Sequence, residues 1–147
     1  MIDLPTQTVL QEVLRRESRS LLSYVGEAFP WASADEGEAL SLLRQMVQDE
    51  GRAVAALGQF LVRRRIGLPY VGSYPTGFTT INFLALDYLL PRLADAERRS
   101  VADLERELAV IKDEAARAPV RNLLDVKRRH LPALEALAAQ HSTAAVP

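Results

Sequence analysis

Two stretches of the chain, 46–61 and 123–138, carry the same helical pattern of apolar residues, and each interrupts it with an ionisable residue at the centre. Apolar side chains recur in both at spacings of three and four, which is typical of one face of an α-helix. The interruptions are Glu50 in the first stretch and Lys127 in the second, with His130 one turn further on. A charged group on the buried face of a helix is costly unless it pairs with another charge or binds a metal. The pattern therefore predicts a helix bundle with a polar site in its core.

Four helical patterns account for most of the 147 residues. They cover about 6–28, 33–66, 79–93 and 119–140. Pro91 and a capping signal at Ser100 leave open whether 101–111 continues the third helix or forms a short fifth one. The segment 142–147 is small and polar enough to fray, and we expect a frayed tail over 141–147. The length suits one core, so we expect an all-α, single-domain four-helix bundle over residues 1–147.

The long connection between the second and third helices, residues 67–79, is rich in proline and glycine. This composition disfavours both helix and regular strand. When extended, thirteen residues reach roughly 40 Å, close to the length of the preceding helix at about 1.5 Å per residue. A crossover of this length allows the third helix to run parallel to the second.

Composition excludes several classes of function. The formal net charge is −1, which gives no electrostatic reason to expect nucleic acid as a partner. The chain has no cysteine, so thiolate metal ligands and cysteine nucleophiles are excluded. No apolar run approaches the roughly 18 residues of a membrane span, and no signal peptide is apparent. We therefore expect a cytoplasmic protein that binds neither membrane nor nucleic acid.

Helical spacing brings further ionisable residues toward the core. Glu17 lies three residues after Leu14 and four before Leu21, on the apolar face of the first helix. Asp87 lies at the edge of the third stripe. Each of the four helices therefore carries an ionisable group at mid-length. The predicted core site consists of Glu17, Glu50, Asp87, Lys127 and His130.

The arrangement resembles the ferritin-like superfamily, especially its rubrerythrin-like members. In that family two helices each supply a Glu and the other two each supply Glu-x-x-His, which together hold two iron or manganese ions. Carried over to this chain, the resemblance assigns the two single carboxylates to Glu17 and Asp87. The likeness covers nearly the whole length of the chain.

The two Glu-x-x-His motifs are degenerate. Glu50 is followed three residues later by Ala53 where the family has His, and Lys127 stands where the family has the Glu that precedes His130. A shifted register would place Arg52 at the first His position, but Arg52 falls outside the apolar stripe.

These departures suggest that the ammonium of Lys127 replaces the metals with a network of salt bridges, although Lys127 could instead extend to solvent. The sequence therefore predicts a vestigial di-metal site in a non-catalytic structural or interaction module that forms a homodimer and holds no cofactor. The alternative is a metal-dependent oxidoreductase or iron-handling protein whose iron or manganese site has fewer ligands than the family's.

Overall fold

The computed structural model describes residues 1–27, 36–83 and 85–144, and all of its regular elements within these ranges are helical. The elements are α1 (Leu4–Glu17), α2 (Leu21–Glu27), α3 (Gly37–Arg63), the 3₁₀ helix η2 (Thr76–Phe83), α4 (Leu86–Val110) and α5 (Glu114–Ala144). This confirms the all-α class that the periodicity predicted. The expected start of the second helix near residue 33 and the end of the predicted tail, 145–147, lie outside the described residues.

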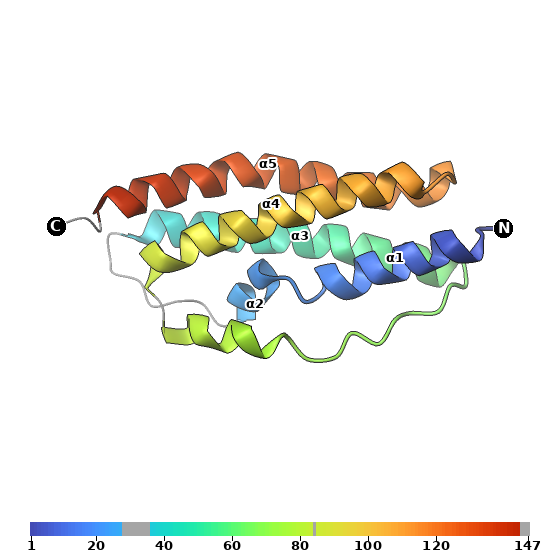
Figure 1. Cartoon of the computed structure of the whole chain (residues 1–147), viewed down its shortest axis with the longest axis horizontal. Helices are drawn as coiled ribbons and strands as arrows, with labels where there is room; N and C mark the ends of the chain where they lie inside the picture. The colour runs from blue at the N-terminus through green and yellow to red at the C-terminus, as the bar shows by residue number, and fades with distance from the viewer. Residues whose placement is uncertain (28–35, 84, 145–147) are drawn as a thin grey trace.

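The long helices α1, α3, α4 and α5 lie lengthwise against one another, and the short α2 follows α1 after a loop (Figure 1). α3 and α4 run in the same direction, whereas α1 and α5 run in the opposite direction. The chain between α3 and η2 crosses back along the length of the molecule. Two side chains from the N-terminal part of the chain hold this crossover in place. Gln11 on α1 donates to the carbonyl of Gly67 at 2.7 Å, and Arg19, between α1 and α2, donates to that of Gly72 at 2.8 Å.

The first helical stretch is interrupted after Glu17, where the sequence predicted one continuous helix over 6–28. Ser18 closes α1, with its N–H donating to Leu14 O at 3.0 Å. The hydroxyl of Ser20 accepts from the N–H of Ser23 at 3.1 Å at the start of α2. Serine hydroxyls compete with helical hydrogen bonds in this way. Glu17 therefore ends a helix.

The third helical stretch is one helix, so the capping signal at Ser100 does not start a new element. Pro91 is the sixth residue of α4 and Pro119 the sixth of α5, and both helices continue through them. Each proline lacks the N–H of one helical hydrogen bond, and the rest of each helix holds it in place. α5 begins before Pro119 because Asp113 caps it by accepting from Ala116 N–H at 2.9 Å. The same helix extends through Ala144, beyond the predicted end at Gln140.

The interior contains two separate apolar clusters. One gathers around Leu10, Leu57, Leu104 and Leu123, and the other around Val25 and buried residues of the other half of the molecule. Along each of α1–α2, α3, α4 and α5, a buried ionisable residue separates residues of the first cluster from residues of the second. These are Glu17, Glu50, Glu97 and Lys127. A polar layer therefore divides the core.

Candidate functional site

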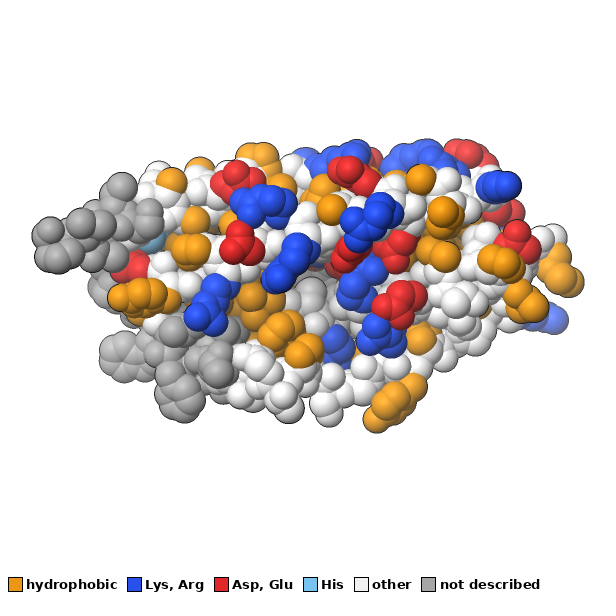
Figure 2. All heavy atoms as spheres, in the orientation of Figure 1, with side chains coloured by type: hydrophobic (Ala, Val, Ile, Leu, Met, Phe, Trp, Pro, Cys, Tyr) orange, Lys and Arg blue, Asp and Glu red, His pale blue; other side chains and the backbone are white. Residues whose placement is uncertain are grey.

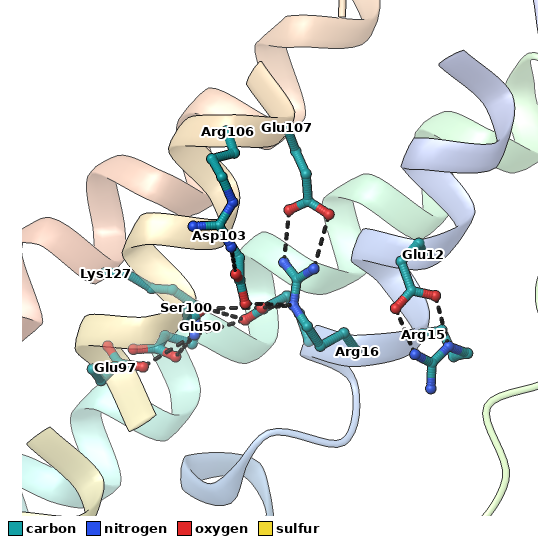
Figure 3. A network of polar contacts seen from close by, with 11 residues as sticks. Glu12, Arg15, Arg16, Glu50, Glu97, Ser100, Asp103, Arg106, Glu107 and Lys127 are labelled. Atoms are coloured by element: carbon teal, nitrogen blue, oxygen red, sulfur yellow. Dashed lines mark hydrogen bonds and ion pairs between the residues drawn. The ribbon is translucent and has the colours of Figure 1, made fainter. Parts of the chain in front are cut away.

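Lys127 occupies the centre of this polar layer. Its side chain is 1% exposed, and its Nζ lies 2.7 Å from Glu17 Oε1, 3.0 Å from Glu50 Oε1 and 3.0 Å from Glu97 Oε1. Figure 3 shows the side chain reaching from α5 to carboxylates on the neighbouring helices. A lysine ammonium has three N–H donors, and here three carboxylates from α1, α3 and α4 surround it. Although burial lowers the pKa of Lys127, these carboxylates outweigh burial and raise it above its ordinary value.

Glu17 is held as an anion from several sides. The hydroxyl of Ser100 lies 2.9 and 2.8 Å from its two carboxylate oxygens, and Arg16 Nε donates to Oε2 at 2.9 Å. Burial raises the pKa of Glu17, but Lys127, Arg16 and Ser100 together bring it below its ordinary value. Arg16 also forms a bidentate salt bridge with Glu107, in which both N–H···O distances are 2.8 Å. This salt bridge joins α1 to α4 (Figure 3).

Glu50 pairs with both polar residues of α5. His130 Nδ1 lies 2.6 Å from Glu50 Oε2, and Lys127 contacts the other oxygen. Burial raises the pKa of Glu50, but Lys127 and His130 outweigh it and lower the pKa to about 2. The second ring nitrogen of His130, Nε2, lies 3.3 Å from Asp49 Oδ2. An imidazolium can donate to both carboxylates, whereas a neutral ring can donate to only one.

Glu97 differs from the other two carboxyl groups. Burial and the nearby negative charge of Glu50 raise its pKa to about 9, against the opposing effect of Lys127. Its Oε2 is the buried side-chain oxygen that has no hydrogen-bond acceptor or donor partner in the described part of the chain. A neutral Glu97 resolves this, because its proton can be directed toward Glu50. The site therefore holds two buried anions and one neutral carboxyl around a single ammonium.

The structure brings together Glu17, Glu50, Lys127 and His130, but it places Asp87 elsewhere. Asp87 lies in the first turn of α4 and contacts His141 at 3.1 Å. The carboxyl group that α4 contributes to the core is Glu97, which the sequence reasoning missed. The predicted role of Asp87 is thus corrected: α4 begins only at Leu86, so Asp87 lies in its first turn, ten residues before Glu97.

Arg16 and Ser100 are further members of the site that the sequence reasoning did not include, and Asp49 joins the site through His130. The register of the α3 motif is also visible. Ala53 is buried, whereas the side chain of Arg52 is 73% exposed, so position 53 faces the interior.

The donor atoms of the site define what it could bind. Glu50, Glu97 and His130 each offer an atom within 4.8 Å of the others, a spacing that could suit a metal ion. The ammonium of Lys127, however, lies 3.0 Å from both of these carboxyl groups. Ala53, which is buried one turn after Glu50, carries no side-chain donor atom. In the core, the cation is the ammonium of Lys127, and the surrounding carboxyl groups are its counter-ions.

Two hollows flank the interruption between α1 and α2. One, of about 310 Å³, is lined by Glu17, Glu50 and the serines of the interruption. The other, of about 300 Å³, is lined by Glu17, Glu97 and Lys127 together with three arginines. The interruption therefore brings surface hollows close to the buried charges on both sides.

Comparison of the chain with protein-family models, with curated proteins and with solved structures finds no match. Among the described residues, no helix combines the length and apolar character needed to cross a bilayer.

Proposed function

We propose that this chain is a ferritin-like four-helix bundle whose di-metal site has been replaced by a lysine-centred ion cluster, and that it acts as a non-catalytic structural or interaction module. The observation that carries the proposal is the position of Lys127 Nζ, within 3.0 Å of carboxyl groups on three different helices. Three donors meeting three acceptors satisfy the ammonium without a metal.

Electrostatics supports a replacement over coexistence of lysine and metals. Two unit charges about 4 Å apart interact by about 4 kcal/mol at an effective dielectric near 20, so a divalent ion would be repelled by roughly twice that amount. The carboxylates that would attract such an ion already neutralise Lys127. A metal could therefore enter only if Lys127 moved out or lost its proton, and the raised pKa of Lys127 opposes the loss of the proton.

The helix directions and the long crossover support the ferritin-like part of the proposal, since α3 and α4 are parallel and separated by a connection that spans the molecule. The surface supports the expectation that nucleic acid is not a partner: on the face in Figure 2, basic and acidic side chains are interspersed. As part of the same proposal we place the protein in the cytoplasm and expect it to form a homodimer. Sedimentation at several concentrations would test the homodimer.

The test is metal analysis of protein purified without chelators. To restrict the measurement to the core, it is made on the full chain and on a His141→Gln variant, which leaves His130 as the sole histidine. We expect well under one equivalent of iron or manganese in both. Near-stoichiometric metal bound through Glu50, Glu97 and His130 would overturn the proposal in favour of the alternative, a metal-dependent oxidoreductase or iron-handling protein.

A further inference from the structure

A second group of metal-binding residue types lies away from the core, where the starts of α3 and α4 meet the end of α5. Glu36 precedes α3, Asp87 lies in the first turn of α4, and His141 lies in the last turn of α5. Because α3 and α4 run parallel and α5 runs opposite to them, these three helix ends meet at the same end of the molecule (Figure 1). The three side chains are partly buried, with 17%, 31% and 19% of each exposed.

The distances within this group suit a single metal ion. His141 Nδ1 lies 3.1 Å from Asp87 Oδ1 and 3.6 Å from Glu36 Oε2. Zinc binds imidazole nitrogen and carboxylate oxygen at about 2.0–2.2 Å, and in a tetrahedron such ligand atoms lie about 3.3–3.6 Å from each other. The ligand oxygens of Glu36 and Asp87 lie within 4.8 Å of each other, so one ion could contact all three atoms once the two carboxylates close around it. It would take the place of the Nδ1 proton.

The charge balance here is the opposite of that in the core. In the core the cation is part of the chain, because Lys127 sits among the carboxylates. At the helix ends, two carboxylates face one imidazole beside a hollow of about 410 Å³. The described residues that line this hollow include Glu38 and no lysine or arginine. The open hollow leaves room for a further ligand of the ion, such as water.

We propose that Glu36, Asp87 and His141 form a site for a divalent transition-metal ion, with Zn²⁺ the best match, and that the ion fastens the ends of α3, α4 and α5 together. This site is separate from the lysine-centred cluster and does not depend on its role. An ion that binds the folded chain and not the unfolded chain would stabilise the fold by mass action.

The chain contains two histidines, which gives a matched pair of variants. Untagged full-length protein is titrated with ZnCl₂ by calorimetry, in the wild-type form and as His141→Gln, Asp87→Asn and His130→Gln. We expect one equivalent of Zn²⁺ to bind, and the affinity to fall by about 10- to 100-fold or more in the first two variants, since even outer-shell partners of a metal have effects of this size. His130→Gln should bind like the wild type.

A second measurement keeps the test valid if His130→Gln does not fold. In ring-nitrogen spectra of the ¹⁵N-labelled wild-type protein, Zn²⁺ should shift the Nδ1 resonance of His141 and leave that of His130 in place. The proposal is overturned if no Zn²⁺ binds below millimolar concentrations, if His141→Gln binds as tightly as wild type, or if the shifted resonance belongs to His130. That last result would place the metal in the core and would contradict the proposed function as well.

Discussion

Lys127 is the residue on which the interior depends most. All three N–H groups of its ammonium face carboxyl oxygens, so its removal would leave Glu17 and Glu50 as buried anions without their main counter-charge. Breaking a buried ion pair by removing one partner typically costs about 3–5 kcal/mol. We therefore expect Lys127→Met to lower the free energy of unfolding by about this amount, as measured by urea titration near pH 7.

The chain offers a matched control for this experiment, because its other lysine, Lys112, is exposed. Lys112→Met should change the free energy of unfolding by no more than about 0.5 kcal/mol. If the two methionine variants were equally stable, Lys127 would not be neutralising buried carboxylates.

Glu97 provides a pH-dependent prediction. Its pKa in the folded protein is raised to about 9, whereas a carboxyl in the unfolded chain titrates near its ordinary value of about 4.3. Between these values the folded state binds more protons than the unfolded state, so this group makes stability fall as pH rises. Glu97→Gln keeps a neutral group of similar shape and should flatten the decline in unfolding free energy between about pH 5 and 9.

The pH series is measured by urea unfolding, with Glu105→Gln as the control. Glu105 lies on the same helix but is half exposed in its pair with Arg128. Its replacement should leave the pH dependence close to that of the wild type. An unchanged slope in Glu97→Gln would show that Glu97 is ionised in the folded protein. Glu17 and Glu50 act in the opposite sense: their lowered pKa values make stability fall as the pH drops below their ordinary range.

At the scale of elements, the helical stripe was enough to predict where α3 and α5 place their polar residues. Glu50, Lys127 and His130 each interrupt an unbroken apolar pattern, and the structure brings the three together. For α4 the pattern held a usable signal that was missed. Glu97 lies seven residues after Leu90 and seven before Leu104, both of which are buried. It therefore occupies the same helical face.

The reasons for the miss are local. Pro91 and Ser100 suggested that the third helix ends and restarts, which would have separated Glu97 from both of its apolar neighbours. At Glu17 the opposite error was made, because the sequence predicted a continuous helix where the structure has a break. No proline or glycine lies there, and three serines within six residues were the only signal. Contacts such as that of Arg16 with Glu107 depend on how helices rotate against one another, which a single stripe does not specify.

The packing of α2 on α3 gives a prediction at this scale. A Cβ added to Gly26 would lie 2.5 Å from Val47 Cγ1, too close for either atom to remain in place. Overpacking of this kind costs typically about 1–3 kcal/mol, so we expect Gly26→Ala to destabilise the protein in thermal and urea unfolding. Adding Val47→Ala removes the obstructing methyl groups and should recover part of the loss through coupling between the two sites.

The same substitution elsewhere should have the opposite sign. Gly51 lies within α3, and an added Cβ there meets nothing within 4 Å. Alanine is favoured over glycine inside a helix by about 1 kcal/mol, so Gly51→Ala should raise the free energy of unfolding. If both glycine variants were stabilised, the close contact between α2 and α3 would be wrong.

At the scale of the whole molecule, the polar layer depends on the order and direction of the helices. The crossover returns the chain so that α4 runs parallel to α3 (Figure 1). This arrangement brings together four ionisable residues from α1, α3, α4 and α5, namely Glu17, Glu50, Glu97 and Lys127. Their separation in sequence is large, yet each lies between the two apolar clusters. The charged layer between the two apolar clusters also fixes the relative heights of the helices, because sliding any helix would leave a buried charge without its partner.

This geometry can be tested by rebuilding the ligand set that the ferritin-like resemblance implies. Ala53 is buried one turn after Glu50 on α3, and Lys127 precedes His130 by three residues on α5. Ala53→His combined with Lys127→Glu would supply four carboxylates and two imidazoles facing one another, so we expect the double variant to bind two divalent ions such as Mn²⁺ or Fe²⁺. It should melt at a higher temperature when they are added.

The background and the partial variants make this outcome specific to the core. The variants are prepared with His141→Gln, so that metal at the helix ends does not contribute, and binding is followed by calorimetry and thermal unfolding. Lys127→Glu alone should be the least stable variant without metal, because it adds a buried carboxyl group and removes the ammonium that neutralises the others. Arg52→His with Lys127→Glu is the matched control: the side chain at position 52 is 73% exposed, so this pair should not bind two ions. If the Ala53→His pair folds without binding metal, the arrangement of carboxylates around Lys127 is not that of a ferritin-like centre. If the Arg52→His pair binds instead, α3 is rotated relative to the core.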